Sequence, residues 1–255
     1  MPQQELILAI ETSSRVGSVA MANENGLLAE VMFSGEMRHS VEILPCIRDL
    51  LARFHGTPDD IRQVYLSQGP GSFTGLRIAV TLAKAMVLAN AVKVVAVDTL
   101  DVIAANVPVS NETPRVIAPI LDAKRDQFFV ATYERQPAPR ADLNAEPGSA
   151  RGLALPNWAK TQPDTIMTAE QFLRQFASPG TPVGILGDGL LYHEDRFKAD
   201  GIRVLDRPYW SPTAGNVYRL GRRKALEGRF EDPLQLAPLY LMPAEVTLKN
   251  LRPQI

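Results

Sequence analysis

The sequence is poor in the residues that build metal and redox centres. Its 255 residues include a single cysteine, Cys46, and three histidines. One cysteine cannot form an intramolecular disulfide, and it has no second thiol with which to hold zinc. The histidines, His39, His55 and His193, fall in different predicted elements without a paired spacing. The sequence therefore predicts no metal site, and its low cysteine content fits a reducing cytoplasm.

The net charge is close to zero, and the sequence predicts no apolar run that approaches the length of a membrane span. The 27 Lys and Arg residues nearly balance the 28 Asp and Glu residues, so the chain as a whole does not attract nucleic acid or anionic lipid. The opening segment "MPQQELILAIETS" has no basic residue before its short apolar run, which predicts no cleaved leader and no membrane association. A composition that is 45% hydrophobic and 22% charged is typical of a globular protein with one large domain or two lobes.

The first hundred residues alternate between strand-like and helix-like patterns. In chain order, the predicted elements are strands at 6–10, 16–22 and 27–33, a helix at 39–54, a strand at 61–68, a helix at 74–90 and a strand at 92–97. The Asn25-Gly26 pair favours a tight turn between the second and third strands, and Pro45 is expected in or near the first turn of the first helix. This β-β-β-α-β-α-β order is the half-domain pattern of the actin, hexokinase and heat-shock ATPase fold.

A second, looser copy of the pattern is predicted after residue 108. Its predicted elements are a hairpin at 115–123 and 127–135 joined at "DAKRD", a helix at 168–177, a strand at 182–189 and a late helix at 211–228. Ser211 is the expected cap of the late helix, with Pro212 in its first turn. Residues 136–157 predict a surface excursion. We thus expect a two-lobed α/β protein with a mixed sheet and helices in each lobe, lobes at 1–108 and 109–255, and the last helix and tail as candidates to pack back on the first lobe.

The stretch "SQGPGSFTGLRIAVTLAKAM" raises the question of whether its glycines cradle phosphate or aim a helix. It lacks the Gly-Lys-Ser/Thr of a P-loop, and the spacing of Gly69, Gly71 and Gly75 misses the dinucleotide fingerprint. Helix amides could still bind an anion, but a tight strand-to-helix turn is favoured. The helix that follows is apolar nearly all round, so it must be buried on more than one side, within this chain or against a partner.

Six segments, found in order along the chain, resemble one known family. They are "LAIETSS", "HSVEILPCI", "GPGSFTGLRIAVTLAKAM", "VVAVDTLDVIA", "PILDAKRDQFFVATY" and "APLYLMPAEV". Together they look like the TsaB family, also called YeaZ, throughout its length. That resemblance implies an actin-like fold and a non-catalytic partner of TsaD, which transfers threonylcarbamoyl to the adenosine beside the tRNA anticodon. A third protein, TsaE, supplies ATPase activity in the same complex, and this chain is expected to form a homodimer when alone.

The resemblance also directs the choice of interface residues. The two N-terminal helices are expected to form a helical bundle with TsaD. The candidate interface residues are His39, Val41, Leu44, Ile47, Leu51, Leu76, Ala79, Val80, Ala83, Met86 and Val87. The histidine pair that binds metal in TsaD aligns here with Thr99 and Ile103, neither of which can replace histidine as a ligand. We therefore expect no catalytic residue and no required cofactor in this chain.

Two other classes of function stay open from the residues. An independent actin-like ATPase would use carboxylates on two hairpin loops, and ATP or ADP is a candidate ligand of the assembled complex. The candidate residues of a vestigial nucleotide site are Glu11, Thr12, Ser13, Gly71, Asp122, Gly187, Asp188 and Gly189. A peptidase would need a histidine pair or a nucleophile with a base, which the sequence does not offer. A purely structural homodimer is the other class of function.

Direct contact with tRNA, the substrate of the complex, is left open. The best candidates for such a contact are Arg219, Arg222, Arg223 and Lys224.

Overall fold

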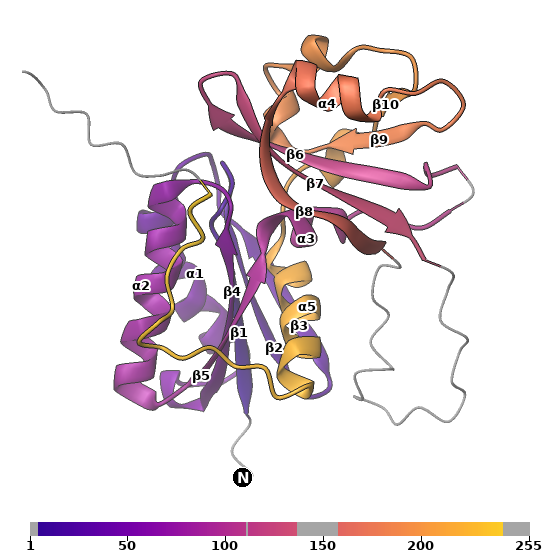
Figure 1. Cartoon of the computed structure of the whole chain (residues 1–255). Coiled ribbons are helices and arrows are strands. Elements are labelled where there is room, and N and C mark those ends of the chain that lie inside the picture. The colour runs from indigo at the N-terminus through magenta and orange to yellow at the C-terminus, as the bar shows by residue number, and fades with distance from the viewer. Residues whose placement is uncertain (1–4, 111, 137–157, 242–255) are drawn as a thin grey trace, which may run out of the picture.

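The computed structural model describes residues 5–110, 112–136 and 158–241 and places them in two lobes, each built on a five-stranded mixed sheet (Figure 1). The first sheet has the order β3-β2-β1-β4-β5. Its strands are β1 (Leu6–Glu11), β2 (Ser18–Asn23), β3 (Gly26–Met32), β4 (Ile61–Gly69) and β5 (Lys93–Asp98). The first three strands are antiparallel neighbours, and β4 and β5 continue the sheet in parallel with β1.

Helices cover both faces of the first sheet, which explains why every residue of its central strand β1 is buried. Alternate residues of β1 point to opposite faces: Leu8 packs with α1 (His39–Arg53) and α2 (Phe73–Asn90), whereas Ala9 packs with α5 (Ala214–Leu226). In Figure 1 the helices α1 and α2 lie on one side of this sheet and α5 lies on the other.

The second sheet has the order β10-β9-β6-β7-β8. Its strands are β6 (Val116–Lys124), β7 (Gln127–Arg135), β8 (Trp158–Thr168), β9 (Val183–Leu186) and β10 (Ile202–Val204). Helix α4 (Ala169–Phe176) contributes Phe172, which is fully buried and makes an edge contact with Phe197 at 5.6 Å between ring centroids. The core of this lobe thus contains a group of packed aromatic side chains among its aliphatic ones.

Two segments tie the lobes together. Helix α3 (Thr99–Ala104) places Leu100 and Ile103 in the core of the second lobe, although it directly follows β5 of the first sheet. The chain returns to the first lobe with α5, and after this helix Leu236 is buried there and the Leu239 N–H donates to the Gln68 carbonyl at 2.7 Å. The C-terminal third of the chain therefore contributes to both lobes.

The two-lobed α/β fold and the order of the N-terminal elements are confirmed, and several details differ. Strands β8 and β10 were not predicted. Pro45 lies in the interior of α1, and Thr213, not Ser211, caps α5 by accepting a hydrogen bond from the Asn216 N–H. The predicted surface excursion at 136–157 lies, apart from residue 136, outside the described residues. The lobe boundary after residue 108 stays a prediction.

Helix α2 corrects one further expectation. Its 18 residues are long and apolar enough, by length and composition alone, to cross a membrane, whereas the sequence had predicted no run of that length. One of its faces packs in the core of the first lobe, through Leu76, Ala79, Val80 and Ala83. Such a helix is apolar because it packs on a sheet and carries a second apolar face, which is described below.

Candidate functional site: an inter-lobe cavity and an apolar helical face

The glycine loop between β4 and α2 packs directly against the turn after β1. The Ser72 N–H donates to the Ser13 carbonyl at 2.7 Å, and the Thr12 hydroxyl donates to the Gly75 carbonyl at 2.8 Å. A Cβ atom at Gly75 would lie 1.8 Å from the Thr12 carbonyl oxygen. Only glycine permits so close a backbone approach. The loop therefore fixes the start of α2 against the first sheet, as the tight-turn reading predicts.

Glu11 is enclosed below this loop. Its carboxylate is fully buried and accepts hydrogen bonds from the Ser13 N–H at 2.6 Å and from the hydroxyls of Ser13 and Ser67. Burial raises the pKa of Glu11, and these hydrogen bonds offset only part of that effect. Because Glu11 does not line the inter-lobe cavity, it is placed to brace the loop rather than to meet a ligand.

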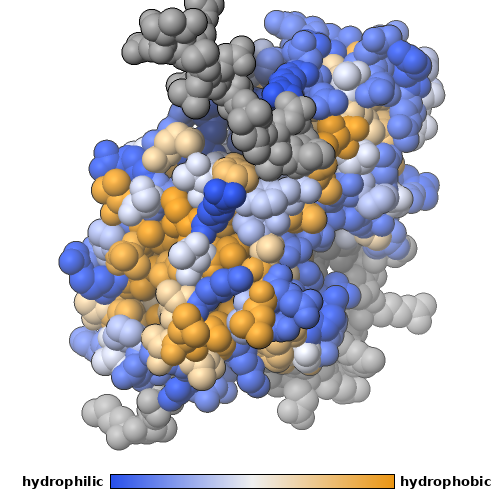
Figure 2. Space-filling view, turned by 60° about the vertical axis from the view of Figure 1, so that its left-hand side comes forward, coloured by the Kyte–Doolittle hydropathy of each residue, from blue (hydrophilic) through white to orange (hydrophobic). Residues whose placement is uncertain are grey.

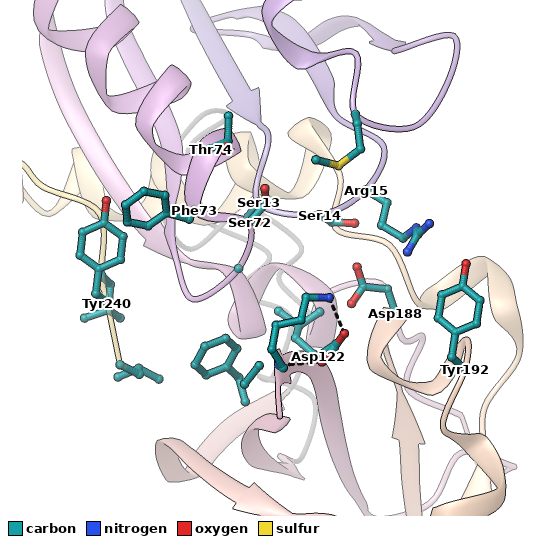
Figure 3. A pocket seen from close by; sticks show the side chains of 18 of the residues that line it. Ser13, Ser14, Arg15, Ser72, Phe73, Thr74, Asp122, Asp188, Tyr192 and Tyr240 are labelled. Atoms are coloured by element: carbon teal, nitrogen blue, oxygen red, sulfur yellow. Dashed lines mark hydrogen bonds and ion pairs between the residues drawn. The ribbon is translucent and has the colours of Figure 1, made fainter. Parts of the chain in front are cut away.

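A cavity of about 450 Å³ lies between the lobes, beside the glycine loop (Figure 3). Its polar end is lined by Ser13, Ser14, Arg15, Asp122, Lys124, Asp188, Tyr192 and His193. Its apolar end is lined by Phe73, Leu121, Phe129, Leu239, Tyr240 and Leu241, whereas Met37 lies beside Arg15. Figure 3 shows Phe73 and Tyr240 on one side of this space and Asp188 with Tyr192 on the other. The cavity thus combines an aromatic end with a charged end.

The charged end is lined by two aspartates in different electrostatic states. Burial raises the pKa of Asp188 to about 6, and the nearby Asp122 carboxylate adds to this, while a hydrogen bond with Ser14 lowers it. For Asp122, burial raises the pKa, but hydrogen bonds from the Lys124 N–H and Nζ outweigh burial and hold the pKa below its usual range. Lys124 is therefore already paired with Asp122, 2.6 Å away.

Half of the predicted vestigial nucleotide residues meet at this cavity. Ser13, Gly71, Asp122 and Asp188 line it, whereas Glu11, Thr12, Gly187 and Gly189 do not. The two glycines of the second lobe serve packing instead, since a Cβ atom at Gly187 would lie 2.3 Å from the Ile120 carbonyl oxygen and one at Gly189 would lie 2.9 Å from it. The interpretation of the "GDG" segment as a turn is favoured over a base contact.

The second surface is the outer face of α1 and α2. Figure 2 shows apolar side chains gathered over these helices, with a few polar ones between them. The most exposed large apolar residues of the two helices are Val41, Leu44, Phe73 and Leu88, with exposed fractions of 64%, 59%, 44% and 89%. A groove of about 440 Å³ runs between Leu44, Leu51, Leu82 and Met86. An exposed apolar face of this kind is characteristic of an interaction surface.

The structure divides the predicted interface residues into two groups. Val41 and Leu44 are exposed, and Met86 and Val87 are partly exposed. The others are buried in the chain's own core: His39, Ile47, Leu51, Leu76, Ala79, Val80 and Ala83. They are buried because the inner stripe of each helix packs on the sheet. Ile47 and Leu51 nevertheless line the groove of the outer face, whereas the other five do not. In particular, Ala83 is 0% exposed, so an arginine there would disrupt the core of the lobe.

His39, one of the candidate interface residues, makes its hydrogen bond within the chain. Its Nε2 lies 2.9 Å from the Ser14 carbonyl oxygen, and its ring packs against Phe33. Burial lowers the pKa of His39, with the Ser14 contact acting in the opposite direction. The neutral ring therefore links α1 to the turn that borders the cavity.

The comparisons with known proteins decide the family. The tRNA threonylcarbamoyladenosine biosynthesis protein TsaB of Bacillus subtilis strain 168 is 35% identical over 252 residues, which are 97% of this chain and 99% of the relative. The Escherichia coli K12 protein of the same name is 33% identical and covers 92% of this chain and 94% of the relative. The chain belongs to the TsaB family. This membership supports a role in tRNA threonylcarbamoyladenosine biosynthesis.

Further matches place the family in a wider group. The family model of TsaD, tRNA N6-adenosine threonylcarbamoyltransferase, matches residues 26–165, so this chain also belongs to the wider family that the model describes. A TsaB-like fold is found in two solved structures from Pseudomonas aeruginosa, YeaZ and a protein with similarity to peptidase YeaZ. They superpose with TM-scores of 0.71 and 0.72 at 22% identity, over 93% of this chain and 100% of theirs.

Two residues that the resemblance singles out lie on α3. Thr99 and Ile103, where the resemblance predicts no metal ligand, are both 0% exposed. Among the described residues, no three His, Cys, Asp or Glu side chains are grouped so as to hold a metal ion.

The basic cluster on α5 is engaged within the chain. Arg219 donates to the Asn216 side chain at 2.9 Å, Arg223 donates to Glu227 at 3.2 Å, and Lys224 donates to the Ala96 carbonyl at 2.8 Å. The Nε atom of Arg222 is buried. These contacts weaken the interpretation of the cluster as a phosphate-binding surface.

Proposed function

We propose that this chain is a non-catalytic accessory subunit that binds TsaD and supports threonylcarbamoyl transfer to the adenosine beside the tRNA anticodon, in a complex that includes TsaE. The single observation that carries the proposal is the exposed apolar face of α1 and α2. A side chain such as Leu44, exposed to 59%, or Leu88, exposed to 89%, loses contact with water only when another molecule covers it.

A non-catalytic role is supported by the chemistry of the buried groups. The two positions that align with the TsaD histidines hold Thr99 and Ile103, and Glu11 is enclosed below the glycine loop. In this proposal the chain requires no cofactor of its own, and ATP or ADP stays a candidate ligand of the assembled complex. When TsaD is absent, a second copy of the chain would cover the same face, which gives a homodimer.

Light scattering after size-exclusion chromatography tests the proposal. The wild-type chain, its TsaD counterpart and their equimolar mixture are measured, and the mixture is expected to give a one-to-one heterodimer in place of any homodimer. Leu44→Asp is expected to weaken this association at least tenfold, because a carboxylate buried at the interface would have no partner. The same substitution should leave the fold intact, since Leu44 is exposed in the free chain.

The matched control is Val109→Asp, which places the same charge on a 39% exposed apolar residue outside the two helices. It is expected to bind TsaD as the wild type does. Unchanged affinity of Leu44→Asp for TsaD, with a wild-type circular dichroism spectrum, would contradict the assignment of this face. A chain that never associates with TsaD at micromolar concentration would contradict the accessory role itself.

A further inference from the structure

The contact between the lobes includes a polar cluster on the far side of β7 from the aromatic core. Asp98 and Asp101 stand three residues apart at the start of α3, a spacing that places both carboxylates on one side of the helix. Lys160 and Asp164 stand four residues apart on β8, so they point to the same face of the second sheet. The two pairs meet where β5 and α3 face β8.

A single ammonium group joins the cluster. The Nζ atom of Lys160 lies 2.7 Å from Asp101 Oδ1, 2.7 Å from Asp164 Oδ1 and 3.3 Å from Asp98 Oδ2. Three carboxylates thus match the three donors of the ammonium group. The side chain of Lys160 is 25% exposed, that of Asp164 is 8% exposed, and those of Asp98 and Asp101 are 29% and 32% exposed. The four charged groups are thus largely, but not fully, shielded from water.

Neighbouring groups connect the cluster to the rest of each lobe. The Tyr133 hydroxyl of β7 donates to Asp101 Oδ1 at 2.6 Å, and the Gln68 side chain at the end of β4 donates to Asp98 Oδ1 at 3.1 Å. Gln68 is also the residue whose carbonyl accepts the Leu239 N–H. The cluster therefore reaches the strand that leads into the glycine loop and α2.

The charges in the cluster are mutually dependent. Burial lowers the pKa of Lys160, but the Asp101 and Asp164 carboxylates outweigh burial, so the pKa lies well above its ordinary value and the side chain stays charged. For Asp164, burial raises the pKa despite the attraction of Lys160. Moving the lobes apart would take Asp98 and Asp101 away from Lys160 and leave the Tyr133 hydroxyl without its acceptor Asp101, while Asp164 of the same strand would keep Lys160. The loss of these contacts is unfavourable.

We propose that Lys160 is an inter-lobe lock, which holds β8 against Asp98 and Asp101 and so fixes the angle between the lobes without any bound ligand. Two-lobed chains move about their interface unless something restrains it. Here side chains of the chain itself supply that restraint. The cluster favours one arrangement, because only that arrangement brings Asp98 and Asp101 to the ammonium group that Asp164 of the same strand already contacts.

Distances between spin labels on the purified chain test the lock. In a Cys46→Ser background, labels are attached through Asp59→Cys on the first lobe and Asp200→Cys on the second, both exposed. The wild type is expected to give one narrow distance distribution. Lys160→Met removes the ammonium group, keeps most of the side-chain length and leaves three facing carboxylates, so the distribution is expected to broaden and its mean to increase.

Two more variants make the test decisive. Lys198→Met removes an exposed lysine that pairs only within the second lobe, with Asp195, and is expected to keep the wild-type distribution. Asp98→Asn removes one cross-lobe charge while Lys160 keeps its other two partners, and it is expected to broaden the distribution even if Lys160→Met does not fold. Wild-type distributions for the folded Lys160→Met and Asp98→Asn chains would overturn the proposal, as would equal broadening by Lys198→Met. Neither TsaD nor tRNA is present, so this outcome is independent of the proposed function.

Discussion

Replacement of Asp188 by asparagine should stabilise the chain at neutral pH and not at acid pH. Asp188 opens the short 3-10 helix Asp188–Leu190 on the second lobe, at the edge of the inter-lobe cavity. Burial raises its pKa from 3.8 to about 6, with a further contribution from Asp122, while hydrogen bonding to Ser14 and the charges of Arg15 and Lys124 act in the opposite direction. The folded chain therefore favours the protonated carboxyl group.

The sign and size of the effect follow from proton linkage. Between pH 3.8 and about 6 the folded state binds more protons at Asp188 than the unfolded state does, so the free energy of unfolding decreases as the pH rises through this window. A shift of about two pH units corresponds to roughly 3 kcal/mol. Because the side chain retains some contact with solvent, screening should reduce the effect to about 1–2 kcal/mol. Asparagine stays neutral and its carbonyl can still accept a hydrogen bond.

Urea unfolding of wild type and Asp188→Asn at pH 4 and pH 7.5 measures the difference. We expect the variant to be more stable by about 1–2 kcal/mol at pH 7.5 and close to the wild type at pH 4. Asp200→Asn, which replaces an exposed aspartate of the same lobe, serves as the control and should change little at either pH. An Asp188→Asn chain that is less stable than wild type at pH 7.5, or equally stabilised at both pH values, would refute the reasoning.

Two core substitutions give further predictions. Gly75→Ala should lower the melting temperature markedly, because its Cβ atom would lie 1.8 Å from the Thr12 carbonyl oxygen, whereas Gly35→Ala, whose Cβ atom would meet Arg38 at 3.4 Å, should have little effect in the same thermal melts. Phe172→Ala should reduce the free energy of unfolding in urea by about 3–5 kcal/mol, since the fully buried ring packs on Phe197; a loss below 1 kcal/mol would contradict this.

The N-terminal half of the fold was predictable because its elements carry one clear pattern each. Strands β1 and β5 are apolar on both faces since helices cover both faces of the sheet, and their length separates them from helices. Asn23 and Gly26 mark the ends of β2 and β3 at the turn that the Asn25-Gly26 pair predicts. In this part of the chain the local sequence pattern and the tertiary packing favour the same secondary structure, so the elements can be predicted from the pattern alone.

The second lobe shows where local pattern fails. Strand β8, "WAKTQPDTIMT", contains a proline and several polar residues, and Met167 is its one residue in the buried hydrophobic core. Two of its polar residues, Lys160 and Asp164, belong to the Lys160 cluster, which is a tertiary contact with no local signal. The cap of α5 was misplaced by two residues because Ser211 and Thr213 are both good capping residues, and Pro212 favoured the earlier one.

Seven of the eleven predicted interface residues are buried in the free chain for a related reason. Helical spacing selects Val41, Leu44, Ile47 and Leu51 as one apolar set, but the first two are exposed and the last two are buried. A helix that is apolar over much of its circumference does not reveal which stripe meets its own sheet. Only the packed structure separates the stripe that holds the lobe together from the stripe that stays free.

The contacts of the glycine-rich loop explain its role in a chain for which we expect no catalytic residue. Gly75 and Thr12 fix the start of α2, and Gln68 links the preceding strand both to the C-terminal segment and to Asp98 of the Lys160 cluster. The orientation of α2 therefore depends on contacts from both lobes. A chain that acts by presenting a helical face needs that face held still, whereas an enzyme that closes over its substrate needs its lobes to move. A Lys160 cluster that restrains movement between the lobes suits a chain that presents a helical face.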